Sequence, residues 1–196
     1  QDNGIAVTIS KAEIKLFGFN ITNSHEEEDV FTSSAVRVLS NSNTLSFNKV
    51  TNSYAGILLE DTSDNTISYN SIDVVDFGIV LTKADDNQIR YNTILDSEEN
   101  DIELTNTGYS TGSTGNTISD NEEIGIIKII NSDNNLLVAQ DSTTINLVNS
   151  ANVSAIGSEF DFVICNSESS LYLKNYFNLN VTSENSPVQG ADLKVW

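Results

Sequence analysis

One apolar position framed by two asparagines recurs along the first two-thirds of the chain. The pattern reads Asn-x-apolar-x-x-Asn and begins at Asn43, Asn65, Asn87 and Asn116. The first two steps span 22 residues each, and a fixed period of this size is typical of repeat architectures. The third step spans 29 residues, and its excess falls in the Gly-, Ser- and Thr-rich stretch 106–115, which we predict to be a loop inserted at a turn.

A second apolar element keeps the same phase as the first. Its copies are Ala55–Leu59, Phe77–Leu81, Asn100–Leu104 and Ile124–Ile127. Each coil therefore contains at least two short apolar strands separated by polar corners. Such a strand is not stable alone, but equivalent strands stacked about 4.8 Å apart enclose a continuous core and pair their backbones. The pattern predicts an all-β chain folded as a right-handed parallel β-helix, a solenoid with coils of about 22 residues.

Stacking places equivalent side chains of successive coils in columns. We expect three inward columns, namely Leu45, Ile67, Ile89 and Ile118; Val50, Ile72 and Ile94; and Ile57, Ile79, Ile102 and Ile126. The framing asparagines tolerate the left-handed backbone of a sharp corner, and their amides can bond from coil to coil. We therefore expect a structural ladder of Asn43, Asn65, Asn87, Asn116, Asn48, Asn70, Asn92 and Asn121.

Three aromatic residues, Phe47, Tyr69 and Tyr91, occupy one phase of the repeat and are expected to stack as a column. Packing explains such a column better than a sugar-binding platform does. After Asn121 the apolar strands recur roughly every 8 to 10 residues, which predicts shorter coils toward the C-terminus. We assign residues 1–175 to the β-helix. The segment 176–196 holds the only proline and is predicted to cap the solenoid or to begin an immunoglobulin-like β-sandwich.

The stretch from Asn65 to Leu81 resembles the right-handed parallel β-helix repeats of the NosD-like family. The family's coils read Asn-x-Ile-x-x-Asn-x-Ile, followed by aromatic-Gly-Ile-x-Leu, and the resemblance covers residues 43–130 well. Proteins with such repeats include archaeal surface-layer-like and sheath-like envelope proteins, periplasmic accessory proteins and carbohydrate-active enzymes. The segment Pro187–Val195 resembles the first strands of the immunoglobulin-like modules of archaeal surface proteins. The resemblance implies a scaffold and leaves the function open.

Composition narrows the possible partners and the compartment. The net charge of −19 opposes binding to nucleic acid or to anionic lipid, and no apolar run is long enough to span a membrane. The single cysteine, Cys165, lies in an apolar strand and is expected to be buried. A chain that begins at Gln1 is compatible with a processed secreted protein. Three sequons, at Asn20, Asn152 and Asn180, also favour an extracellular or cell-surface location with glycosylation.

Candidate chemistry is limited to carboxylates. Acidic residues of successive coils predict a calcium patch beside the loop that contains Tyr109, made of Asp96, Glu98, Glu99, Glu122 and Glu123. No cofactor other than calcium is expected. Copper ligation is poorly supported by a chain with no methionine, one cysteine and one histidine.

Catalysis is not expected either. Paired carboxylates at a defined separation, or calcium with a basic proton acceptor, are what polysaccharide-cleaving β-helices need. Asp85-Asp86 stands here without the other motifs typical of polygalacturonases, and His25 lies in an acidic loop where we expect it to be solvated.

Two functional hypotheses remain. The first is an extracellular structural protein of a surface layer, sheath or filament, which assembles with copies of itself because a solenoid has open strand edges at both ends. The second is a β-helix that binds or cleaves carbohydrate, such as cell-surface glycans, through the acidic patch and the Tyr109 loop. Concentration-dependent polymerisation favours the first, and saturable glycan binding by a monomer favours the second.

Overall fold

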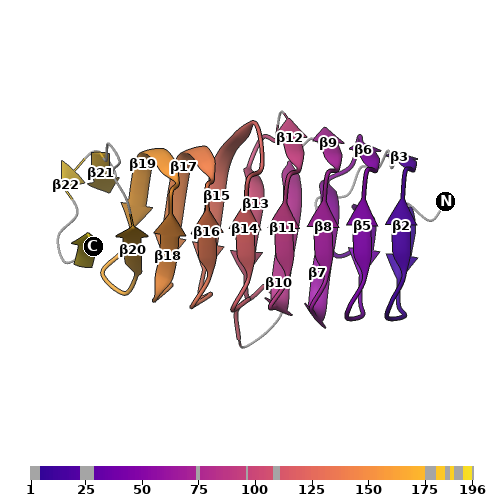
Figure 1. Cartoon of the computed structure of the whole chain (residues 1–196), viewed down its shortest axis with the longest axis horizontal. Coiled ribbons are helices and arrows are strands. Elements are labelled where there is room, and N and C mark those ends of the chain that lie inside the picture. The colour runs from indigo at the N-terminus through magenta and orange to yellow at the C-terminus, as the bar shows by residue number, and fades with distance from the viewer. Residues whose placement is uncertain are drawn as a thin grey trace.

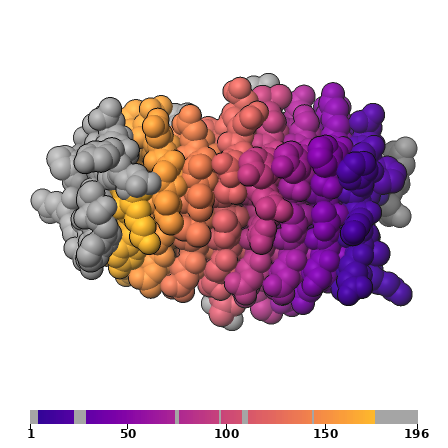
Figure 2. Space-filling view, viewed as in Figure 1, coloured from indigo at the N-terminus to yellow at the C-terminus, as the bar shows by residue number. Residues whose placement is uncertain are grey.

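The computed structural model describes residues 5–22, 29–73, 76–95, 97–107, 111–174, 180–183, 186–187 and 192–195. These residues form three sheets that run along one long axis, with the chain ends at opposite ends of the molecule (Figure 1). Successive coils lie side by side as bands along that axis (Figure 2). All strand pairs are parallel except β21 with β22, so the predicted right-handed parallel β-helix is confirmed.

The sheets are named A, B and C. Sheet A contains β1 (Val7–Ile9), β4 (Ser34–Val38), β7 (Ala55–Ser63), β10 (Phe77–Asp85), β13 (Asn100–Thr105), β15 (Ile124–Ile130), β17 (Asp141–Val148), β19 (Glu159–Cys165), β21 (Asn180–Ser183) and β22 (Ser186–Pro187). Sheet B contains β2 (Lys15–Phe17), β5 (Thr44–Ser46), β8 (Thr66–Ser68), β11 (Gln88–Arg90), β14 (Thr117–Ser119), β16 (Leu136–Val138), β18 (Val153–Ile156), β20 (Ser170–Lys174) and β23 (Asp192–Val195). Sheet C contains β3 (Asn20–Thr22), β6 (Lys49–Thr51), β9 (Ser71–Asp73) and β12 (Thr93–Leu95).

Two of the three predicted inward columns have the expected members. Leu45, Ile67, Ile89 and Ile118 are in register on sheet B and fully buried. Val50, Ile72 and Ile94 are in register on sheet C and also fully buried. These columns form one continuous apolar core along the axis, as the repeat predicts.

The third column needs a correction by one residue. Ile57, Ile79 and Ile102 are in register on sheet A, but Ile127, not Ile126, follows Ile102. Ile126 is 36% exposed. The carboxylate of Asp101 accepts the backbone N–H groups of Gly125 (2.7 Å) and Ile126 (2.8 Å), which fixes the backbone at this corner. By hydrophobicity alone, the apolar run 124–130 could align with β13 in several registers. Only the observed register allows the two hydrogen bonds to Asp101.

The cross-section of the solenoid changes after β12. Sheet C ends there, and in the next coil only Glu122 bridges to Thr93. Coils that follow are built from sheets A and B alone. The step from Thr117 to Leu136 is 19 residues and that from Leu136 to Ser154 is 18, so the predicted shortening of the coils is confirmed.

The sequence suggested left-handed backbone at the framing asparagines. The structure has this conformation one residue earlier. Phe47, Tyr69 and Tyr91 have φ values of 55–56°, and each directly precedes a ladder asparagine. None of the eight ladder asparagines has a positive φ. Their function at the corner is therefore hydrogen bonding, and the strained conformation falls on a neighbour.

The last described strands extend the two-sheet coils. β21 pairs with β19 and β23 pairs with β20, both in parallel. The antiparallel pair of β21 and β22 is a departure from the solenoid pattern. The division at residue 175 and the immunoglobulin-like start of the segment 176–196 stay predictions.

Candidate functional site

Two rows of amide side chains form hydrogen-bonded ladders at the two ends of sheet B. In the first row, each backbone N–H of Asn43, Asn65, Asn87 and Asn116 donates to the Oδ1 of the next member, with Asn135 as the fifth. In the second row, Asn48, Asn70 and Asn92 donate in the same way to the next asparagine, and Asn121 donates to Oε1 of Gln140. All of these side chains are buried. They stabilise the scaffold, and hydrogen bonds between coils occupy their amide groups.

A further ladder was not evident from the repeat. The backbone N–H groups of Ser113, Ser132 and Ser150 donate to the Oγ atoms of Ser132, Ser150 and Ser169. Serines at 18 or 19 residue spacing are the sequence signal, but it is hidden in a chain so rich in serine.

The predicted aromatic column exists and lies on the outside. Phe47 and Tyr69 stack with ring centroids 4.9 Å apart, and Tyr69 and Tyr91 stack at 5.0 Å. Phe17 extends the column with a tilted contact to Phe47 at 5.2 Å. The stacked rings cover one another's faces and present their edges outward. A sugar ring packs against an aromatic face, so packing is a better account of this column than a sugar platform.

A groove lies on the outer face of sheet A and is called the sheet A groove. Its volume is about 220 Å³, and its lining residues are Asp29, Val30, Phe31, Tyr54, Phe77, Val80, Thr82, Glu103, Thr105 and Thr107. It forms because Val30 and Phe31 pack on an outer apolar cluster of Ala55, Leu58 and Val80. The unbroken apolar runs in β7 and β10 signal this second cluster, since a strand covered on both faces does not alternate.

Glu103 places a partly buried carboxyl in the sheet A groove. Its burial raises the pKa of the carboxyl, while the nearby charge of Lys128 and the hydrogen bond from Asn100 (2.8 Å) lower it. Thr82 Oγ1 donates to the carbonyl of Thr107 at 2.7 Å, which fixes the rim. Tyr54 and Phe77 make an edge contact at 5.5 Å. Aromatic edges, hydroxyls and the two carboxyls of Asp29 and Glu103 therefore line a single small groove.

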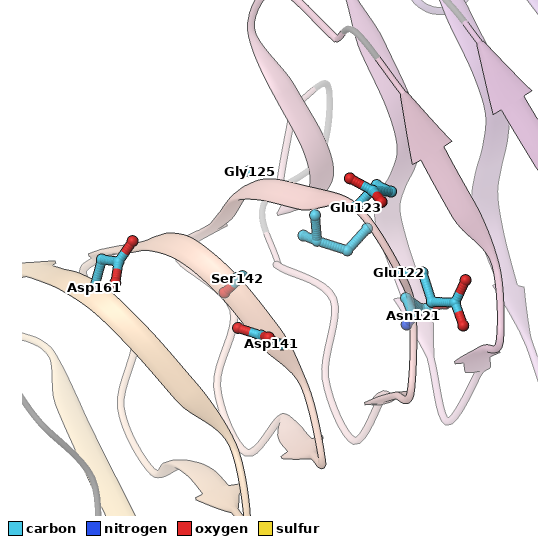
Figure 3. A pocket seen from close by; sticks show the side chains of 8 residues that line it. Asn121, Glu122, Glu123, Gly125, Asp141, Ser142 and Asp161 are labelled. Atoms are coloured by element: carbon cyan, nitrogen blue, oxygen red, sulfur yellow. The ribbon is translucent and has the colours of Figure 1, made fainter.

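A second groove lies where sheet C ends and is called the step groove (Figure 3). Its volume is about 490 Å³, and its lining residues are Asn121, Glu122, Glu123, Ile124, Gly125, Asp141, Ser142 and Asp161. The carboxylates come from three successive coils, with Glu122 and Glu123 in the first, Asp141 in the second and Asp161 in the third.

The structure distributes the predicted calcium residues over different places. Glu122 and Glu123 line the step groove, whereas Glu98 and Glu99 are exposed before β13. Asp96 and Tyr109 lie outside the described residues. Within the described part of the chain, no three His, Cys, Asp or Glu side chains are close enough to hold a metal ion.

Other predicted residues have clear places. Asn20 and Asn152 are exposed, as a glycosylated asparagine must be, and Asn180 begins β21. Asp85 accepts hydrogen bonds from the backbone and hydroxyl of Thr114, so it fixes a corner. Cys165 is buried, and burial raises the pKa of its thiol. His25 lies outside the described residues.

The stacked parallel coils define a protein of the right-handed parallel β-helix class. A family model described as periplasmic copper-binding protein (NosD) matches residues 1–190, so the chain belongs to the NosD family. No curated protein gives a significant match. The family description refers to a compartment outside the cytoplasm, and no helix in the described residues is long and apolar enough to cross a membrane.

The residues of this chain do not fit the copper of the family description. Copper sites use thioether, thiolate and imidazole ligands. The chain has no methionine, and its one cysteine is buried in the core cluster. The described part of the chain contains no histidine to accompany it. We therefore derive no chemistry from copper.

Proposed function

We propose that the protein is a structural component outside the cytoplasm, in a surface layer, sheath or filament, that associates through the end of its solenoid. The observation that carries this proposal is the composition of the first described coil. Ile14, Phe17 and Phe19 are 41%, 62% and 54% exposed and lie in or beside β2 and β3. Among the described strands, β1, β2 and β3 are the edges of their sheets. Open edges beside exposed apolar side chains favour association.

The amide ladders also end at this coil. Asn43 and Asn48 accept the backbone N–H groups of Ile14 and Phe19, whose own side chains cannot accept a hydrogen bond. An approaching copy therefore meets an apolar surface rather than another rung of amides. The net charge of −19 opposes such contacts at low ionic strength, so association is expected to strengthen with salt.

The test is negative-stain electron microscopy and light scattering of the purified chain across concentration and salt. We expect filaments, tubes or sheets that disappear in the double variant Phe17→Ser with Phe19→Ser. The matched control is Phe162→Ser, which removes an exposed phenylalanine on β19, far along the chain from this end. Dispersed monomers under every condition, or assembly that the double variant retains, contradict the proposal.

The sheet A groove favours a second candidate function, the binding of a carbohydrate. Its aromatic rings, threonine hydroxyls and the carboxyl of Glu103 match the apolar faces and hydroxyl groups of a sugar. We propose binding without cleavage, because Asp29 accepts the N–H of Phe31 at 2.9 Å and is thereby committed to the loop. Saturation-transfer NMR with a panel of neutral and acidic oligosaccharides tests this. Saturation-transfer signals that persist in the double variant Glu103→Gln with Phe77→Leu contradict binding in the sheet A groove. Release of reducing ends from the oligosaccharides contradicts binding without cleavage.

A further inference from the structure

We infer that the sheet A groove selects a glycan whose sugar ring carries a free amino group, held as an ammonium ion beside the carboxyls of Glu103 and Asp29. This inference rests on the second candidate function and names the class of sugar that the same groove takes. Three observations carry it. They are the sign of the charge in the groove, the positions of the nearest protein cations, and the aromatic and hydroxyl groups that surround Glu103.

The charged side chains that line the sheet A groove are both acidic, namely Asp29 and Glu103. Glu103 lies on β13, in register with Val80 of β10 on one side and with Lys128 of β15 on the other. Burial of Glu103 outweighs the charge of Lys128, and the charge of Glu99 acts in the same direction as burial, so the pKa of the Glu103 carboxyl is raised. A carboxylate whose charge is incompletely compensated gains from a cation that donates hydrogen bonds to it.

The nearest cations of the protein lie outside the groove. Arg37 donates to Glu60 at 2.7 Å and to the carbonyl of Phe31 at 3.1 Å, so its guanidinium is engaged in holding the turn that forms one side of the groove. Lys128 is beside Glu103 in the sheet, but it does not line the groove, and these two described residues form no ion pair. An ammonium group on a ligand therefore supplies a charge that the groove itself lacks.

The uncharged lining groups favour a sugar as the carrier of this ammonium. Tyr54 and Phe77 meet edge to face at 5.5 Å, and aromatic rings attract both the C–H face of a sugar and a nearby cation. The hydroxyls of Thr105 and Thr107, 3.0 Å apart, match the hydroxyls of a ring better than the aliphatic chain of a lysine. The groove of about 220 Å³ is smaller than the roughly 300–1,000 Å³ typical of drug-sized ligands, so we expect it to hold one ring of an oligomer.

Calorimetric titration of the intact chain with two matched trisaccharides tests the inference. One is the trimer of glucosamine and the other is its fully N-acetylated counterpart, which has the same rings and linkages but no amino charge. At about pH 6.5 the amines are protonated, and about 0.15 M salt screens the general attraction of cations to a chain of net charge −19. We expect the glucosamine trimer to bind at least about tenfold more tightly, as a hydrogen bond to a charged group requires.

Heteronuclear NMR locates the binding, and we expect the amide shifts of Phe31, Val80 and Thr105 to change. The two levels of the proposal fail differently. If neither trimer binds, carbohydrate binding in this groove is wrong. If both bind equally at these residues, carbohydrate binding stands and the selection of an amino sugar is wrong.

Two variants of the groove change its charge in opposite directions. Glu103→Gln keeps an oxygen that can accept the amide of Asn100, which now donates at 2.8 Å, and should lose at least about tenfold in affinity for the glucosamine trimer alone. Lys128→Gln removes a competing cation and should raise that affinity. The matched control is Glu168→Gln, which makes the same change in net charge at an exposed position and should bind as the wild type does. Circular dichroism establishes that each variant is folded.

Three outcomes of the variant experiments overturn the inference. The first is an equal loss of affinity in Glu103→Gln and Glu168→Gln, which assigns the binding to overall charge. The second is weaker binding of the glucosamine trimer by Lys128→Gln. The third is a lysine tripeptide that binds as tightly as the glucosamine trimer with the same dependence on Glu103, which assigns the groove to a protein ligand instead of a glycan.

Discussion

Asn65 donates twice to one atom of Asn87: its backbone N–H and its side-chain amide lie 2.9 and 3.0 Å from the Oδ1 of Asn87. Asn87 in turn donates to the carbonyl of Asp85 and to the Oδ1 of Asn116. Each amide thus satisfies backbone groups at a corner that sheet hydrogen bonds do not reach. The ladder links neighbouring coils in addition to the strands.

The first prediction concerns this ladder. Asn87→Ala leaves the buried backbone N–H of Asn65 without its acceptor, while Nδ2 of Asn65 still donates to Oγ1 of Thr62 and to the carbonyl of Ser63. We therefore expect a loss of about 1–3 kcal/mol in the free energy of unfolding. Urea denaturation followed by circular dichroism measures it. Asn106→Ala is the control, because Asn106 bonds Asn131 at the surface and its loss should cost less than about 0.5 kcal/mol. Equal losses would contradict a special contribution of the ladder.

The second prediction concerns Tyr69, which stacks between Phe47 and Tyr91 at a left-handed corner with φ of 56°. Tyr69→Ala removes two ring contacts and should lower stability by about 1–3 kcal/mol. Tyr69→Gly removes the same contacts but relieves the left-handed conformation, which costs other residues roughly 1 kcal/mol.

We therefore expect the glycine variant to be the more stable of the two in urea denaturation. At an ordinary helix or strand position the order is the reverse. An alanine variant that is more stable than the glycine variant would contradict the left-handed geometry at residue 69.

The third prediction concerns pH. Burial raises the folded-state pKa of Glu103 above its ordinary value of 4.5. Between pH 4.5 and the raised pKa, the folded protein holds a proton on Glu103 that the unfolded chain has already lost. This group therefore contributes stability at low pH, and that stability is lost as the pH rises through the raised pKa. Glu103→Gln removes that loss. The variant should gain stability relative to wild type as the pH increases above 4.5.

Thermal or urea unfolding of both proteins between about pH 4 and pH 8 measures the difference. Burial also raises the pKa of Asp101, and this contribution is present in both proteins and cancels. A difference between wild type and Glu103→Gln that does not change with pH would contradict the shifted pKa.

The fold was predictable because it depends on a period, and a period is visible in one sequence. Asn43, Asn65 and Asn87 fix both the length of a coil and the register of its strands, and Leu45, Ile67 and Ile89 then occupy equivalent inward positions. Even the one-residue error at Ile126 follows this logic. In the run 124–130 almost every residue is apolar, so hydrophobicity does not distinguish the inward ones.

The grooves were not predictable because neither of them depends on the period alone. The sequence singles out Glu122 and Glu123 as acidic but not their position beside Asp141 and Asp161, because that position depends on the end of sheet C at this corner. The sheet A groove depends on Phe31 packing against strands of later coils. No local pattern encodes such a contact, although the apolar run around Leu58 indicates that something covers it.

The last prediction concerns Gly78, where β10 approaches the next coil. A Cβ atom there would lie 2.4 Å from the carbonyl oxygen of Asp101 and 2.6 Å from Cγ2 of Ile94. The first of these is backbone held in the spacing of stacked strands, and the second belongs to a fully buried column. Neither can move without separating two coils, so Gly78→Ala should cost about 3 kcal/mol or more.

Gly125→Ala is the comparison for Gly78→Ala. A Cβ at Gly125 meets only the Oδ2 of Asp101, at 3.1 Å, which is the end of a side chain. Its urea midpoint should therefore fall less than that of Gly78→Ala. Because a solenoid is stabilised by contacts between neighbouring coils, the Gly78 variant should also expose amides of β10 and β13 to hydrogen exchange before those of β17 and β19. Uniform exchange across all coils would contradict a local break at this contact.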